Sequence, residues 1–144
     1  MPDHRPGPPS VLFVCVKNGG KSQMAAGLMR QLAGDAIAVE SAGTRPGHSV
    51  NELSAASLAE VGVDISNETP KPVTDDLVRA ADVVVTLGRD ARVDPVPGTR
   101  FETWETDEPS ERGIDGIERM RLVRDDIAGR VRDLATRLGV TPEA

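Results

Sequence analysis

The sequence VLFVCVKNGGKSQM, residues 11–24, decides the fold predicted for this chain. It begins with four apolar residues that favour a buried β-strand, because β-branched and aromatic side chains pack well in a sheet. The strand leads through Cys15 into a turn with two glycines. From Ser22 on, the residues have the pattern of an α-helix with Ser22 at its N-cap. The sequence therefore predicts a strand, a tight turn and a helix in direct succession.

This succession favours an anion-binding site. The backbone N–H groups of a glycine-bearing turn and the first turn of a helix both attract negative charge, and Lys21 adds a cation. Such surroundings also favour the thiolate form of a cysteine, which is the nucleophilic form. The alternative is that Cys15 is a small buried apolar residue and that the glycines only close the turn. The stretch by itself leaves both interpretations open.

The length of 144 residues suits one domain with a single core. Residues 1–10 contain four prolines and a glycine, so we expect a disordered N-terminal tail there. The domain is predicted at residues 11–139, followed by a short C-terminal tail at residues 140–144.

The remaining segments alternate between strand and helix patterns. After the first strand, further strands are predicted at residues 36–39, 82–88 and 101–104. Helices are predicted at residues 22–33, 52–61, 74–81 and 114–138, capped in two cases by Asn51 and Thr74. The helix at 52–61 is expected to bury Leu53, Ala56, Leu58 and Val61. This alternation predicts a single-domain α/β fold, a four-stranded parallel sheet with helices on both faces, in which ligands bind at the carboxyl ends of the strands.

Composition excludes several classes of function. The net charge is −6 and no basic stripe is interleaved with aromatic residues, which argues against nucleic-acid binding. No apolar run is long enough to span a membrane, and the first residues lack the pattern of a signal peptide. A single cysteine fits a reducing compartment, so we expect a cytoplasmic protein. We also expect a monomer without a metal site.

Five segments carry a resemblance to a known family. They are VCVKNGGKSQMA at 14–25, ESAGT at 40–44, EVGVDISNET at 60–69, DVVVTLG at 82–88 and WETDEPSERG at 104–113. In this order they resemble the low-molecular-weight protein tyrosine phosphatase superfamily and, within it, the arsenate reductase branch. The stretch after residue 106 is similar to the single-cysteine arsenate–mycothiol transferases of actinobacteria.

The resemblance implies roles for the residues around the cysteine. Cys15 would be the nucleophile, the Ser22 hydroxyl would steady its thiolate, and Asn18 would brace the loop together with Ser41. The backbone N–H groups that would hold the oxyanion belong to Val16, Lys17, Asn18, Gly19, Gly20, Lys21 and Ser22. Ordinary capping and turn chemistry remain the alternatives for Ser22, Asn18 and Ser41.

Two departures from the family pattern affect the chemistry. Lys21 stands where the family has arginine, and a lysine is a point charge that cannot clamp an oxyanion with two parallel hydrogen bonds. The family's acid is an aspartate directly before a proline, but here Glu108 precedes Pro109 and Asp107 stands one residue earlier. In an extended segment only one of the two can face Cys15, and we favour Asp107 slightly because it is shorter. A solvated acidic loop is the alternative.

A missing second cysteine shapes the predicted reaction. Thioredoxin-coupled members of the family carry two further cysteines near the end of the strand at 82–88, whereas this chain has Cys15 alone. An adduct between Cys15 and arsenate would therefore need a thiol from outside the chain. The resemblance implies mycothiol as co-substrate and a mycoredoxin-type reductant, with no tightly bound cofactor. The alternatives are a phosphomonoesterase, which the scarcity of aromatic residues disfavours, and a catalytically silent oxyanion-binding module.

Overall fold

Four parallel strands form a sheet in the order β2-β1-β3-β4 in the computed structural model, which describes residues 7–140. The strands are β1 (Ser10–Cys15), β2 (Ala38–Gly43), β3 (Val83–Leu87) and β4 (Arg100–Trp104). The sheet confirms the predicted fold class. β1 starts at Ser10, one residue earlier than predicted and within the predicted tail of residues 1–10. Residues 1–6 of that tail, and residues 141–144 of the tail predicted at 140–144, lie outside the described residues.

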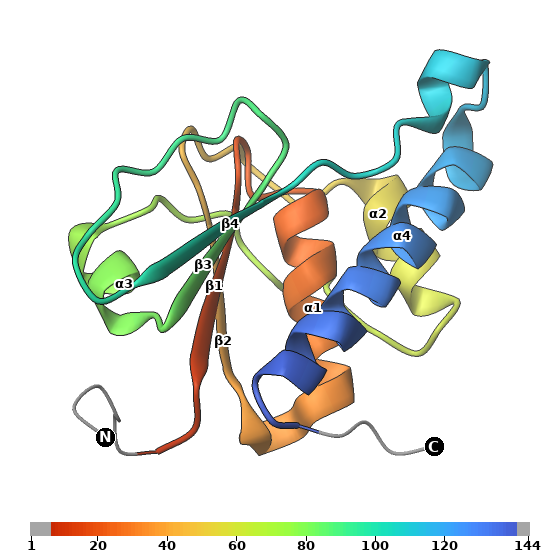
Figure 1. Ribbon diagram of the computed structural model, residues 1–144. Coiled ribbons are helices and arrows are strands. Elements are labelled where there is room, and N and C mark those ends of the chain that lie inside the picture. Colours follow the sequence, from red (N-terminus) through yellow and green to blue (C-terminus); the bar gives the residue numbers. More distant parts are fainter. Residues whose placement is uncertain (1–6, 141–144) are drawn as a thin grey trace.

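Helices cover both faces of the sheet, as predicted. They are α1 (Lys21–Ala33), α2 (Glu52–Ala59), α3 (Asp75–Ala80) and α4 (Gly116–Arg137), with 3₁₀ turns η1 (Gly34–Ala36) and η2 (Pro109–Arg112). α1 and α4 lie on one face with α2 beside them, and α3 lies on the other (Figure 1). Within residues 7–140 no helix is both long and apolar enough to cross a membrane.

The central strand β1 is buried on both sides. Val11 and Phe13 pack toward α1 and α4, while Leu12 and Val14 pack toward α3. Because the chain goes from β1 to β2 on one side and then to β3 on the other, the carboxyl end of β1 lies at the point where the strand order reverses. Ligands bind at this point in open α/β sheets. Cys15 is the last residue of β1.

The second strand lies further along the chain than predicted. β2 spans Ala38–Gly43 rather than 36–39, because η1 occupies residues 34–36 and the strand pairs with β1 over its whole length, from Ser10–Ala38 to Cys15–Gly43. β2 is an edge strand and Glu40 is exposed there, so the apolar pattern used for the prediction stops before the strand does.

The buried side of α2 was predicted wrongly. Of the four apolar residues expected to be buried only Leu58 is, whereas Leu53, Ala56 and Val61 are exposed. The helix instead buries Ser54 and Ser57. Their hydroxyl groups donate hydrogen bonds within the helix and its cap, so they can be buried without an unpaired polar group. The predicted caps Asn51 and Thr74 are confirmed.

Candidate active site

The loop that follows Cys15 connects β1 directly to α1. α1 begins at Lys21 with Gly20 at its N-cap, so the prediction that Ser22 caps the helix is wrong. Ser22 is the second residue of α1 and is completely buried. Its hydroxyl is unavailable for capping because it bonds to Cys15 and Asn18 instead.

The sulfur of Cys15 has two hydrogen-bonding neighbours. The backbone N–H of Asn18 donates to Sγ at 3.2 Å, and the Oγ of Ser22 lies 2.9 Å from Sγ. Since the Nδ2 of Asn18 donates to that same Oγ at 2.8 Å, the hydroxyl hydrogen of Ser22 is free to point at the sulfur. Both donors stabilise negative charge on Cys15, as its predicted role as nucleophile requires.

The carbonyl groups of the loop are bound from outside. Backbone N–H groups of the segment after β2 donate to them, in the pairs Thr44–Cys15 (3.1 Å), Arg45–Val16 (2.7 Å), Gly47–Lys17 (2.9 Å) and Asn51–Gly19 (2.6 Å). Among residues 7–140, no acceptor is present for the N–H groups of residues 16–20 other than that of Asn18. These N–H groups are available to an oxyanion, as the predicted cradle requires.

Residues 43–51 lie so close to the loop after Cys15 that two glycines are required at the contact. A Cβ atom at Gly43 would lie 2.7 Å from the carbonyl oxygen of Val16, and one at Gly19 would lie 2.8 Å from that of Ser49. No side chain fits at such distances from a backbone atom. The two glycines therefore allow the hydrogen bonds that hold the loop in shape.

Asn18 braces the loop, but not through Ser41 as predicted. Its Oδ1 accepts from the backbone N–H of Lys71 at 3.0 Å and from the Nε2 of Gln23 at 3.3 Å, while its Nδ2 binds Ser22. Ser41 is buried within β2, two residues before the strand ends, and Asn18 lies beyond that end. Asn18 adopts a φ of 53°, in the left-handed region that asparagine tolerates.

Gln23 was not predicted as part of the site. It is buried in α1, and its Nε2 donates to the carbonyl oxygen of Asn18 at 3.1 Å. The signal in the sequence was a polar residue within the apolar face of a helix, which is uncommon unless the residue has a buried partner.

The two candidate acids point to different cations. Glu108 forms an ion pair with Lys21, and its other oxygen accepts from the Nη2 of Arg119 at 3.4 Å. Asp107 is bound by both Nη atoms of Arg112, at 2.8 and 3.1 Å. The two carboxylates thus diverge, as predicted for an extended segment. The structure places Glu108 next to the loop, although Asp107 was the favoured acid.

The pKa values of both carboxyl groups are below their usual range. Burial acts to raise the pKa of Glu108, but hydrogen bonds and charge from Lys21 and Arg119 outweigh it and lower the pKa. The hydrogen bonds from Arg112 are the main reason that the pKa of Asp107 is lowered. Both groups are therefore carboxylates at neutral pH while the loop is empty of substrate.

A cleft of about 900 Å³ opens in front of Cys15. The cysteine loop, residues 45–54 and one side of α4 line it, and its cationic side chains are Lys17, Lys21, Arg45 and Arg119. Glu52 is the only carboxylate in this lining. Lys21 also borders a second cleft of about 770 Å³, in which carboxylates predominate. An anion would accordingly be attracted to the first cleft.

No phenyl or indole ring lines the cleft in front of Cys15. Trp104 is 4% exposed and packs against Phe13 in the core, with ring centroids 5.7 Å apart. The aromatic ring of a substrate would therefore find no phenyl or indole ring to pack against at the rim of this cleft.

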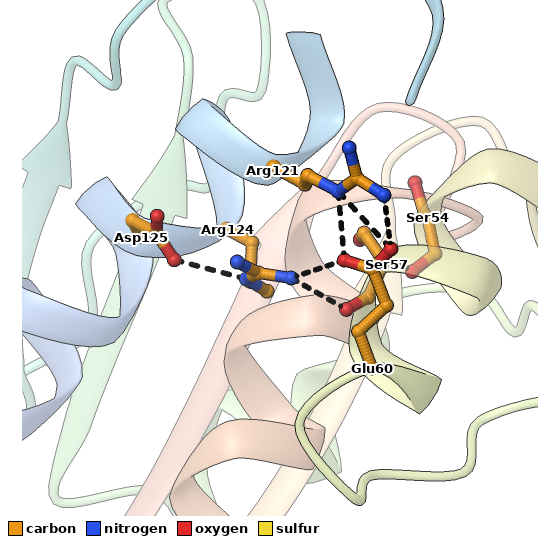
Figure 2. Close-up of polar contacts among 6 residues, drawn as sticks. All are labelled: Ser54, Ser57, Glu60, Arg121, Arg124 and Asp125. Atoms are coloured by element: carbon orange, nitrogen blue, oxygen red, sulfur yellow. Dashed lines mark hydrogen bonds and ion pairs between the residues drawn. The ribbon is translucent and has the colours of Figure 1, made fainter. Parts of the chain in front are cut away.

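Ion pairs join two walls of the cleft. Glu60, directly after α2, is bound by Arg121 and Arg124 of α4 at distances of 2.6 to 3.0 Å. Arg124 also donates to the carbonyl oxygen of Ser57 at 2.9 Å. Figure 2 shows the two arginines reaching from α4 toward α2, with Asp125 on the other side of Arg124. We call these contacts the Glu60 clamp.

Comparison with known proteins identifies relatives of this chain. A family model described as low molecular weight phosphotyrosine protein phosphatase matches residues 10–142. The arsenate reductase of Bacillus subtilis is 36% identical over 132 residues, which cover 87% of this chain and 94% of that protein.

Two similar solved structures are also described as arsenate reductases. The thioredoxin-dependent arsenate reductase Cg_ArsC1′ of Corynebacterium glutamicum matches 96% of this chain with a TM-score of 0.79 and 36% identity, and this chain spans 65% of that chain's length. An arsenate reductase in the phosphate binding state matches with a TM-score of 0.78 and 33% identity, covering 90% of this chain and 98% of that one.

Proposed function

The chain belongs to the low molecular weight phosphotyrosine protein phosphatase family, on its arsenate reductase branch, and from this premise we propose that Cys15 attacks arsenate and passes the arseno group to a small thiol. One observation carries the proposal: the sulfur of Cys15 accepts a hydrogen bond from the N–H of Asn18 and lies 2.9 Å from the Oγ of Ser22, at the base of a loop whose other N–H groups have no acceptor among residues 7–140. The proposed nucleophile and the N–H groups that would bind the oxyanion thus lie in the same loop.

The first step joins the sulfur to arsenic. The thiolate of Cys15 attacks the arsenic atom, an S–As bond forms, and one As–O bond breaks. The departing oxygen takes up a proton and leaves as water. The loop N–H groups and Lys21 hold the remaining oxygens, and the proton comes from Glu108 or from the arsenate's own hydroxyl.

The second step requires a thiol from outside the chain, since Cys15 is its only cysteine. An external thiolate attacks arsenic, forms a new S–As bond and releases Cys15 as thiolate. Arsenic keeps its oxidation state in this transfer. Reduction to arsenite then needs two electrons from thiols, which a mycoredoxin-type protein would supply. Mycothiol is the proposed acceptor, and the cleft in front of Cys15 has room for an oxyanion and a small thiol together.

Phosphomonoester cleavage is the second candidate, favoured by the description of the family model. The same nucleophile would form a phosphocysteine that water resolves. The cleft disfavours aryl phosphates, because no phenyl or indole ring borders it.

A single-turnover experiment tests the proposal. The protein is mixed with arsenate and excess mycothiol, and the arseno–mycothiol conjugate is followed by mass spectrometry. We expect conjugate from the native chain and none from Cys15→Ser, which is close in size but is not ionised. Lys21→Ala should lower kcat/KM for arsenate about 10- to 1000-fold.

Parallel reactions separate the alternatives. Glutathione and reduced thioredoxin in place of mycothiol identify the thiol. Cleavage of an aryl phosphate without any conjugate would replace the proposal with a phosphatase. Binding of arsenate without turnover by any of the thiols would make the chain an oxyanion-binding module.

A further inference from the structure

Arg119 reaches the site from α4, about a hundred residues along the chain from the loop that it faces, and lines the same cleft as Cys15 and Lys21. We infer that Arg119 is a second cationic contact for the bound oxyanion, beside Lys21. The inference rests on the proposed function, since it names a further residue that binds the proposed substrate.

Lys21 by itself is a limited partner for arsenate. Its ammonium group is a compact charge that does not bind two oxygens in a fixed plane, whereas a guanidinium offers parallel N–H donors to two oxygens. Arsenate carries up to two negative charges at neutral pH spread over several oxygens. One ammonium group leaves part of that charge without a cation, and Arg119 is placed to supply one.

Glu108 marks where the two cations converge. Lys21 binds its Oε1 and Arg119 its Oε2. Two cations that converge on one carboxylate can converge on an oxyanion of similar charge and spacing. The contact from Arg119 is long, at 3.4 Å, so it is weak and can be exchanged.

Arg119 also has donors to spare. Its Nε is buried and has no acceptor among residues 7–140, Nη2 donates to Glu108, and Nη1 makes only a long contact of 3.9 Å with the sulfur of Met120. Buried N–H groups of a guanidinium nearly always have a partner in a native protein. Because Nε itself is covered, a ligand oxygen in the cleft would be bound through Nη1, for which the thioether sulfur is only a weak acceptor.

The competing explanation is that Arg119 acts only by holding Glu108 in place. A double-mutant cycle separates the two roles, because a residue that acts only through Glu108 has no effect once that carboxylate is gone. The dissociation constant of inorganic phosphate is measured in the full-length protein from protection of Cys15 against iodoacetamide, and that of arsenate in Cys15→Ser by calorimetry.

We expect Arg119→Gln to raise both dissociation constants about 10- to 100-fold, the scale of one charged hydrogen bond. Arg119→Lys should recover part of the loss. The matched control is Arg132→Gln, which removes the same charge from an exposed site about 20 Å further along α4 and should change nothing. Glu108→Gln alone should tighten phosphate binding, since it frees both cations.

The decisive comparison is Arg119→Gln in the Glu108→Gln background. A loss of about tenfold or more there supports a direct contact with the oxyanion. An unchanged dissociation constant in that background, or in the single variant, overturns the inference.

The activity readout separates this inference from the proposed function. Arg119→Gln should raise the KM for arsenate more than it lowers kcat. If the native chain shows no thiol-dependent turnover, but phosphate protection depends on Arg119, the proposed function fails and the oxyanion contact stands. If turnover is normal and Arg119→Gln leaves KM unchanged, the contact fails and the function stands.

Discussion

Cys15 has surroundings that a space-filling cysteine does not need. Its sulfur accepts from the N–H of Asn18 and lies at hydrogen-bonding distance from Ser22, and the side chains of those two residues bond to each other. A cysteine that only filled the core would pack against apolar atoms. The geometry thus favours the nucleophile over the buried apolar residue that the sequence left open.

The assignment of the acid is also a question at the scale of single residues. Because Glu108 lies against Lys21 while Asp107 is held by Arg112, we predict that Glu108→Gln slows formation of the arseno adduct about 100-fold and that Asp107→Asn has little effect. The measurement is the rate of the first step in rapid-mixing experiments across pH.

The lowered pKa of Glu108 sets the form of this pH dependence. A carboxyl group whose pKa is below its usual value has lost its proton at neutral pH in the free protein. It can donate only after an oxyanion competes for Lys21 and brings negative charge close, which raises the pKa again. The native rate should therefore fall on the alkaline side, and Glu108→Gln should flatten that limb. If neither variant slows the step, the arsenate's own hydroxyl supplies the proton.

At the scale of elements, the Glu60 clamp connects α2 with α4, two helices that form walls of the cleft (Figure 2). The residues that lead into α2 include Asn51, whose N–H binds the carbonyl of Gly19, so the position of α2 bears on the shape of the cysteine loop. Hydrogen bonds from Arg121 are the main cause that lowers the pKa of Glu60 from 4.5 to about 2, and Arg124 adds to the effect.

This shift predicts how stability depends on pH. The pKa of Glu60 is lower in the folded than in the unfolded chain, so the clamp contributes fully above about pH 4.5 and is lost as the pH falls to about 2. Glu60→Gln should lower the free energy of unfolding at pH 6, and the difference from the native chain should shrink steadily toward pH 2. Urea unfolding at a series of pH values measures it.

Asp94→Asn is the control for this series, because Asp94 is exposed and forms no ion pair within residues 7–140. A gap between Glu60→Gln and the native chain that stayed constant from pH 6 to pH 2 would show that the clamp does not act through the charge of Glu60.

Some elements could be predicted from the sequence and others could not, for a physical reason. β3 was predicted because its continuous apolar run is typical of a strand buried on both faces. α4 was predicted because apolar residues recur along it at helical spacing, which is typical of a helix buried on one face. α2 buries serines whose hydroxyl groups bond locally, and β2 is an edge strand with polar residues. In neither element do the apolar residues mark the side that is buried in the structure.

At the scale of the whole molecule, the same distinction applies to the site. The cysteine loop is contiguous, so its residue types and spacing, together with the family resemblance, were enough to predict a nucleophile and an oxyanion cradle. Arg119 and Lys71 join the loop only through the fold, and no local signal marks them. The fold also gathers cations at one cleft of a chain whose net charge is −6, which composition alone does not reveal.

The whole chain has one thiol, that of Cys15. Reduction of arsenate to arsenite takes two electrons, and one cysteine can supply only one of the two sulfurs of a disulfide. The native chain should therefore release no arsenite when arsenate is added without a thiol, and with mycothiol present the second step should be first-order in mycothiol. Arsenite assays and non-reducing electrophoresis measure this. Arsenite formed without any added thiol, together with a disulfide-linked dimer of the chain, would show that a second copy supplies the resolving cysteine.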